Sequence, residues 1–206
     1  MNEFGDANLS IADDRFAGIG MSCREEMRTA TRPAHERLHH HAGFSSVQDG
    51  TITLSDYRSL LVRLYGFYLP FERATGTDHS RTDWLERDLA WLGADTPTVP
   101  NLQLCATLPR FDSPPRRLGA LYVAEGSALG GRQLSRGLDR LLGTEALDGR
   151  RFFVGRGDGT GAAWHSFRNR LARAGRDPAR RRLLVSAAIE TFELFENWLS
   201  GWRDMR

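Results

Sequence analysis

Residues 121–134 read LYVAEGSALGGRQL and form the most informative segment of the sequence. Apolar residues recur at helical spacing on both sides of it, so the sequence predicts a helix, yet three glycines interrupt its middle. Each interior glycine costs about 1 kcal/mol of helix stability relative to alanine. A helix with this cost is expected to kink, or to bring bare backbone close to a flat ligand or to another helix.

A histidine near the N-terminus is the expected partner of this helix. Residues 28–41 read RTATRPAHERLHHH, in which Thr31 suits a helix cap and Pro33 a first turn. Leu38 falls on the same helix face as His35, so the imidazole is expected to point toward the apolar side. Such a histidine is either structural or a ligand, and neutral imidazole is a common ligand of haem iron.

Together the two segments resemble the bacterial haem oxygenases, most closely the group found alongside bacteriophytochromes. The resemblance rests on residues 30–35 (ATRPAH) and 122–131 (YVAEGSALGG), with further matches at 57–72 and 190–196, and it spans residues 21–202. It implies an all-α, single-domain helical bundle that holds haem between a proximal helix and a kinked, glycine-rich distal helix. It also implies an enzyme that uses O2 and an external electron donor to cleave haem b to biliverdin, carbon monoxide and free iron.

The resemblance also implies roles for individual residues. His35 matches the proximal iron ligand, while Gly126 and Gly130 match the two glycines closest to haem. Ser127 stands where animal members carry an aspartate, and it joins these two glycines as an expected catalytic residue. Arg168 is the best match to a residue that holds the haem propionates, with the arginines of the proximal helix as alternatives. The other residues expected to contact haem are Arg28, Thr31, Tyr122, Gly131 and Phe195.

Composition fits one soluble domain. The chain has 206 residues, 40% of them hydrophobic and 26% charged, and we expect residues 21–206 to form the domain and residues 1–20 a poorly ordered extension. All 28 basic residues are arginine, but the net charge of only +2 does not suggest a nucleic-acid partner. No apolar run is long enough for a membrane helix and no secretory signal is evident, which predicts a cytoplasmic protein. The expected partners are a ferredoxin or flavodoxin system and a bacteriophytochrome that receives biliverdin.

The remaining pattern is helical almost throughout. Ser55 or Asp56 is expected to cap the second helix, and Pro70 to kink or break it near Tyr68. Leu183 is expected on the buried side of the last helix. The predicted helices cover residues 22–41, 54 to about 68, 82–92, 114–142, 163–174 and 178 onward, with loops at 93–100 and 150–161.

Several other functions fit parts of the sequence. A non-catalytic haem-binding or haem-delivery protein would keep His35 without needing a bare distal helix. A thiamine-degrading type of hydrolase shares the helical architecture and would need a nucleophilic cysteine, for which Cys105 is the candidate. Arg180, Arg181 and Arg182 are a short basic run of the kind found in DNA-binding helices. The spacing of His35 and His39 also suits a metal such as zinc, although no third ligand is evident.

Overall fold

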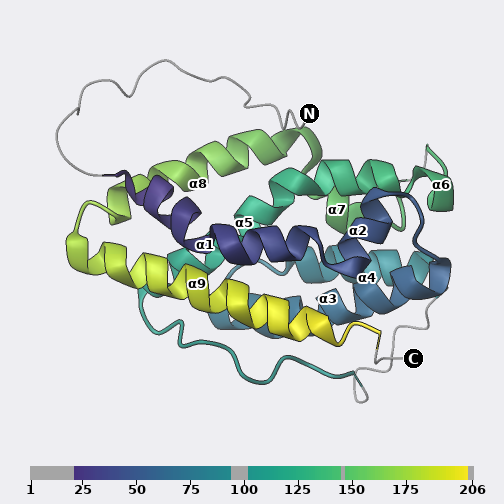
Figure 1. Cartoon of the computed structure of the whole chain (residues 1–206), viewed down its shortest axis with the longest axis horizontal. Helices are drawn as coiled ribbons and strands as arrows, with labels where there is room; N and C mark the ends of the chain where they lie inside the picture. The colour runs from purple at the N-terminus through teal and green to yellow at the C-terminus, as the bar shows by residue number, and fades with distance from the viewer. Residues whose placement is uncertain (1–20, 94–101, 145–146, 204–206) are drawn as a thin grey trace.

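The computed structural model describes residues 21–93, 102–144 and 147–203, and its regular secondary structure in these ranges is entirely helical (Figure 1). This confirms the predicted all-α class. The expectations for residues 1–20 and 94–100 lie outside the described residues. The helices are α1 (Cys23–His39), α2 (Ala42–Gln48), α3 (Leu54–Thr75), α4 (Ser80–Trp91), α5 (Pro114–Gly137), α6 (Asp139–Leu142), α7 (Arg151–Val154), η2 (Gly157–Gly159), α8 (Thr160–Ala174) and α9 (Pro178–Ser200).

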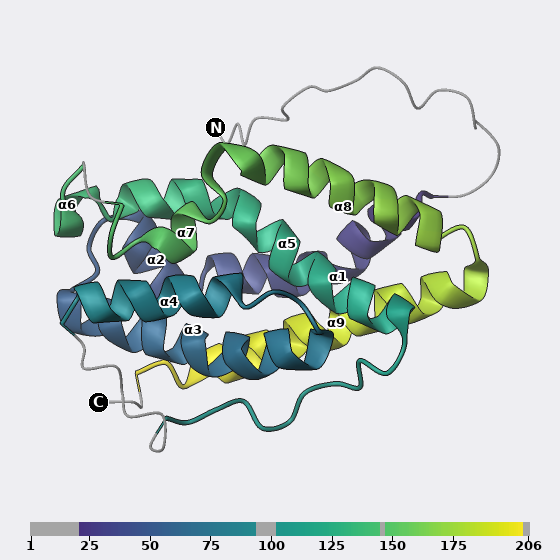
Figure 2. The ribbon, with the colours of Figure 1, turned by 180° about the vertical axis from the view of Figure 1, so that it is seen from behind.

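The last helix, α9, holds two other long helices in place. α1 packs along one side of α9, and α5 crosses it from the other side (Figures 1 and 2). The crossing is close because a Cβ added to Gly119 of α5 would overlap the carbonyl oxygen of Leu184 on α9. α8 lies on the outer side of α5, while α3 and α4 form a pair on its opposite side (Figure 2).

The first helix begins where it was predicted to begin, at residue 22, and Thr31, which suits a helix cap by residue type, is not its cap. Ser22 is the cap: its hydroxyl accepts a hydrogen bond from the Glu25 amide, and the Glu25 carboxylate accepts one from the Ser22 amide. Thr31 lies inside α1, where its hydroxyl donates to the carbonyl oxygen of Met27 at 2.8 Å. The helix also ends at His39 instead of residue 41, because Gly43 belongs to the separate helix α2.

The second long helix also departs from the prediction. Thr53 caps α3 by accepting a hydrogen bond from the Asp56 amide at 3.1 Å, so neither Ser55 nor Asp56 is the cap. Pro70 lies inside the helix, which continues to Thr75 and ends at the left-handed residue Gly76. The predicted break near Tyr68 is therefore wrong.

The glycine-rich helix α5 is one continuous helix, and it is shorter than predicted. It ends at Gly137, and the chain from Asp139 to Leu142 forms the short helix α6, whose last residue is the predicted end of the glycine-rich helix. A Cβ at Gly137 would overlap the carbonyl oxygen of Val47 in α2, so this glycine allows close helix packing. The kink predicted at the central glycines stays a prediction.

The predicted loop at residues 150–161 contains regular structure. The Asp88 carboxylate of α4 accepts hydrogen bonds from the amides of Arg151 and Phe152, at 2.8 and 2.9 Å, and so caps α7 from a distant part of the chain. Burial raises the pKa of Asp88 to about 6, although these two amides oppose the shift.

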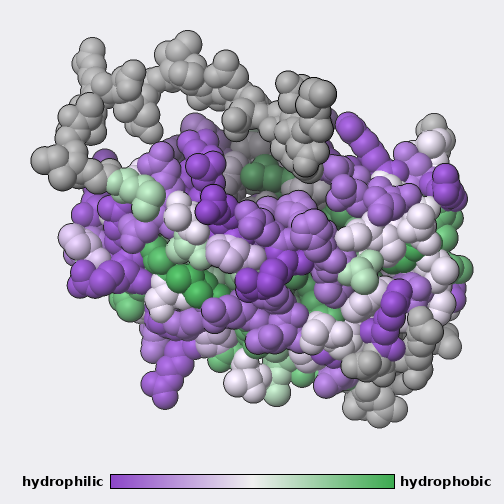
Figure 3. Space-filling model, viewed as in Figure 1, coloured by the Kyte–Doolittle hydropathy of each residue, from purple (hydrophilic) through white to green (hydrophobic). Residues whose placement is uncertain are grey.

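The outer surface carries mainly polar side chains. On the face that Figure 3 presents, hydrophilic residues predominate, and apolar side chains show between α8 and α1. Leu183 is an exposed apolar side chain, with 38% of its surface accessible, so its predicted burial is wrong. Within the described residues, no helix combines the length and the apolarity that a bilayer crossing requires.

Candidate functional site

A cavity of about 640 Å³ lies between α1 and α5, within the range of sites that bind organic ligands. Its walls also include parts of α3, α7, α8 and α9. Arg168 was expected in the site but is not among the residues that line this cavity. The other expected residues all lie on its wall: Arg28, Thr31, His35, Tyr122, Gly126, Ser127, Gly130, Gly131 and Phe195.

His35 enters the cavity from the middle of α1. Its ring packs edge-on against His39, with the ring centroids 4.5 Å apart, and against Phe192 of α9 at 6.2 Å. Partial burial lowers the pKa of His35, and the charge of His39 lowers it further. The imidazole is therefore neutral at neutral pH, the form that coordinates a metal.

The central glycines of α5 fall into two kinds. A Cβ at Gly131 would overlap the carbonyl oxygen of Phe153, so this glycine is needed for the packing of α5 on α7. A Cβ at Gly126 would make only an ordinary contact, 3.9 Å from the Trp164 ring. A Cβ at Gly130 would have no described atom within 4 Å apart from the adjacent backbone of its own helix. Helix packing therefore explains Gly131, but it does not explain Gly126 or Gly130.

Two tyrosines bring hydroxyl groups to the cavity wall. Tyr68 of α3 lies beside the Ser127 side chain, and Tyr122 of α5 lies beside that of Thr31 on α1. Burial raises the pKa of both phenols, so each stays protonated and able to donate a hydrogen bond at neutral pH. The cavity thus combines a mainly apolar lining with a few fixed donors.

Three arginines follow one edge of the cavity along α1. Arg24, Arg28 and Arg32 are four residues apart, so they share a face of the helix, and all three are exposed. Arg32 lies 3.8 Å from Glu36, whereas neither Arg24 nor Arg28 forms a salt bridge with any described residue. This edge is suited to bind carboxylates of a ligand.

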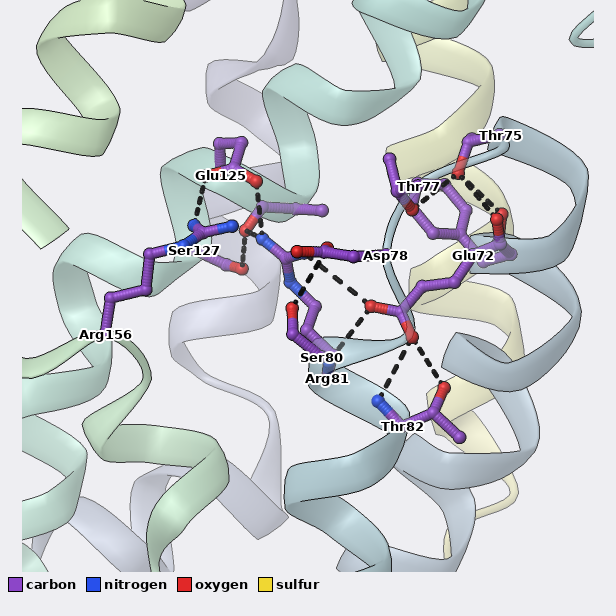
Figure 4. A network of polar contacts seen from close by, with 12 residues as sticks. Glu72, Thr75, Thr77, Asp78, Ser80, Arg81, Thr82, Glu125, Ser127 and Arg156 are labelled. Carbon is purple, nitrogen blue, oxygen red and sulfur yellow. Dashed lines mark hydrogen bonds and ion pairs between the residues drawn. The ribbon is translucent and has the colours of Figure 1, made fainter.

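Glu72, Arg81, Glu125 and Arg156 form a chain of four side chains with alternating charges (Figure 4). Glu72 of α3 is fully buried and accepts hydrogen bonds from the amides of Arg81 and Thr82, which caps the start of α4. Arg81 reaches across to Glu125 of α5, and the second carboxylate oxygen of Glu125 binds Arg156, with both nitrogen–oxygen distances 2.9 Å. Sequence reasoning missed this chain because its members come from four separate segments without a local motif.

Other candidate sites receive less support. Cys105 is buried, does not line the cavity, and has its pKa raised by burial, which disfavours a nucleophilic thiolate. Arg181, in the basic run, pairs with Glu26 at 2.6 Å. No three His, Cys, Asp or Glu side chains cluster as a metal site in the part of the chain that the structure describes.

Comparison with known proteins gives one family. The family model described as "Heme oxygenase" matches residues 21–201. The structure is similar to that of heme oxygenase-1 from the cyanobacterium Synechocystis sp. PCC6803 in complex with heme, with a TM-score of 0.69, 17% identity, and coverage of 87% of this chain and 91% of the other. It is also similar to heme oxygenase from Leptospira interrogans, with a TM-score of 0.70, 17% identity, and coverage of 87% and 99%. No curated protein matches the chain. At this identity the structural likeness establishes the fold alone.

Proposed function

Because this chain belongs to the haem oxygenase family, we propose that it binds haem between α1 and α5 and cleaves it to biliverdin, carbon monoxide and free iron. When bound, haem would supply both the iron that activates O2 and the ring carbon that is oxidised. The observation that carries the proposal is the open space at Gly130, which faces the same cavity as His35. A glycine that no helix packs against, and that costs helix stability, is accounted for when a flat ligand must approach the backbone.

The residues of the cavity fit this substrate. His35, neutral at neutral pH, is suited to bind the iron from the α1 side. Gly126 and Gly130 leave the distal side bare, so that no side chain blocks the path from the iron to the ring edge. The hydroxyls of Ser127 and Tyr68 would supply hydrogen bonds to O2 and to water on that side.

We assign the haem propionates to the arginine row on α1. Arg24 and Arg28 line the cavity and form no salt bridge with a described residue, so their guanidinium groups remain available to carboxylates. This assignment replaces Arg168, which does not line the cavity.

The proposal extends to the setting of the reaction. We propose that residues 21–206 form one cytoplasmic haem oxygenase domain of the bacteriophytochrome-associated group. Electrons would come from a ferredoxin or flavodoxin system, and a bacteriophytochrome would receive the biliverdin. The motif at residues 122–131 supports this placement.

A single-turnover experiment tests the proposal. Haem added to the purified protein should give a Soret band at one equivalent, and reductant with O2 should then yield biliverdin, identified by chromatography. Haem binding without biliverdin, under reduction by both ascorbate and a ferredoxin system, would favour the haem-delivery alternative. Absence of a saturable Soret band would overturn both.

A further inference from the structure

The hydroxyl of Thr160 is buried, and no atom of the described residues forms a hydrogen bond with it. Thr160 is the first residue of α8 and lines the cavity, with only 8% of its surface exposed. The other two buried threonines of the wall, Thr31 and Thr191, each donate to a carbonyl oxygen of their own helix. A hydroxyl that has lost water and gained no partner destabilises a folded protein, so its presence calls for an explanation.

The start of α8 adds hydrogen-bonding capacity to this hydroxyl. The residue before the helix is Gly159, which has no side chain to cap the first turn. Amide groups at the N-terminus of a helix carry a partial positive charge, which favours an oxygen acceptor. The Thr160 hydroxyl and this helix end are therefore suited to bind a carbonyl group of a ligand.

Thr160 lies far from the beginning of the arginine row on α1. At the other end of α8, a Cβ on Gly175 would overlap the Cys23 side chain, so that end contacts the start of α1. From this contact the two helices diverge (Figures 1 and 2). The 15 residues of α8 span about 22 Å, which separates Thr160 from Cys23 and its neighbour Arg24. A carboxylate held by Arg24 therefore does not reach Thr160.

Haem offers no hydrogen-bonding group to a hydroxyl in this position. Its two carboxylates lie side by side on one edge of the ring, and the remaining edge carries methyl groups, vinyl groups and bridging carbons. Cleavage changes this edge, because each of the two pyrrole rings that flank the removed carbon gains an oxygen and becomes a lactam. A lactam presents a carbonyl acceptor beside an N–H donor, and a threonine hydroxyl can both donate and accept.

We propose that Thr160 and the start of α8 form a subsite for a lactam group of the linear tetrapyrrole product. The hydroxyl gains no partner from haem, so the subsite favours product over substrate and holds the product after the iron has left. Threonine populates two rotamers in a helix, so its hydroxyl can turn toward such a group. Trp164, one turn further along α8, also lines the cavity and provides an aromatic surface for a pyrrole ring. The inference rests on the proposed function, because its ligand is the product of that reaction.

Thr160→Val tests the subsite, because valine has nearly the shape of threonine but no hydroxyl. The affinity for added biliverdin should fall about threefold to tenfold, the usual effect of one hydrogen bond, while the affinity for haem stays within about twofold of the wild type. Quenching of tryptophan fluorescence measures the first affinity, and optical titration measures the second. An equal loss for both ligands, or a loss for neither, overturns the subsite.

Thr191→Val is the matched control. Thr191 of α9 also lines the cavity and is fully buried, but its hydroxyl already donates to the carbonyl oxygen of Ala187 at 2.7 Å. Its replacement should lower the thermal midpoint of the free protein and leave the ratio of the two affinities unchanged. Thr160→Val removes an unpaired hydroxyl, so its midpoint should equal or exceed that of the wild type. A fall as large as that of Thr191→Val would show a structural hydrogen bond and would overturn the subsite.

Biliverdin dimethyl ester distinguishes the two kinds of polar group in the product. The ester keeps both lactams but has no carboxylate, so Thr160→Val should weaken its binding by the same factor as that of biliverdin. A loss confined to the free acid would show that Thr160 binds a propionate and would overturn the lactam assignment. Failure of the wild type to convert haem to biliverdin would instead overturn the proposed function. Because the subsite is tested with added biliverdin, the two failures are distinguishable.

Discussion

Arg28 and Arg168 represent two ways of holding the haem carboxylates, and the structure favours Arg28, which lines the cavity. An exposed ion pair contributes only about 0.2–1 kcal/mol, yet it can fix the rotation of a nearly symmetric ring. Arg28→Ala should therefore broaden the distribution of biliverdin isomers while lowering haem affinity only a few-fold. Arg168→Ala, the control, should leave both unchanged. Chromatography of the single-turnover products checks this, and the reverse pattern would return the role to Arg168.

His35 carries a second prediction at the level of single residues. His35→Ala removes the imidazole but should not unfold α1, because the side chain faces the cavity. We expect the variant to bind haem with a changed Soret spectrum and to lose turnover, which added imidazole restores. His39 would become the candidate ligand if the spectrum and activity matched those of the wild type.

Site residues that share one helix were predictable from their spacing in the sequence. Site residues that are held in place by partners on other helices were not. The spacing of Gly126 and Gly130 indicates one helix face, and both do line the cavity. Arg81 was missed because its partners, Glu72 and Glu125, lie 9 and 44 residues away and have no recognisable spacing. Arg168 was expected from similarity alone, and nothing in its local sequence tested that expectation.

Helix α5 allows catalysis and packing to be separated with two neighbouring substitutions. Gly130→Ala adds a methyl group in open space and relieves up to about 1 kcal/mol of helix cost, so its thermal midpoint should equal or exceed that of the wild type. The same methyl would occupy space above haem, so biliverdin yield should fall sharply while haem still binds.

Gly131→Ala provides the matched control, because its methyl would overlap the Phe153 carbonyl. Such overpacking costs about 1–3 kcal/mol, equivalent to about 2–12 °C in thermal midpoint for a chain of this size. Its yield per folded molecule should stay closer to that of the wild type. A destabilised Gly130→Ala with normal yield would contradict the proposed purpose of this glycine.

The capping of α7 by Asp88 predicts that the free energy of unfolding depends on pH. The pKa of Asp88 is about 6 in the folded protein, above the ordinary aspartate value of 3.8, so the folded state binds more protons between these values. Its contribution to stability is therefore fully present below pH 4 and is lost as the pH rises through 6. As the pH rises from 4 to above 6, the free energy of unfolding of the wild type should fall relative to that of Asp88→Asn. Denaturant titrations at several pH values measure it, and a difference independent of pH would contradict the raised pKa.

Helix boundaries show where local sequence rules succeed and fail. The predicted helix start at residue 178 and helix end at residue 142 agree with α9 and α6, because Pro178 and Gly143 each act on their own segment. The start of α1 was predicted correctly at residue 22, where Ser22 and Glu25 form the capping pair, whereas Thr31, which suits a cap by residue type, lies inside the helix. α7 was missed because its cap comes from α4, 63 residues away.

On the scale of the whole molecule, the cavity lies between α1 and α5, which are also connected through α2, α8 and α9. α1 brings the histidine and the arginine row, while α5 brings the bare backbone, and both rest on α9. The chain of charges from Glu72 to Arg156 adds α3, α4 and the segment after α7 to the same wall. A ligand in this cavity therefore contacts most of the fold at once.

Ligand binding should accordingly stabilise the entire protein. A ligand that binds only the folded state at a hundred times its dissociation constant adds about 2.7 kcal/mol to the free energy of unfolding. For a chain of this length that corresponds to a rise of about 5–10 °C in thermal midpoint, which calorimetry with and without haem would measure. Hydrogen exchange should slow in α1 and in residues 155–160, because residues of both segments line the cavity. Haem that bound only to the surface would leave exchange in both segments unchanged and would contradict a site between α1 and α5.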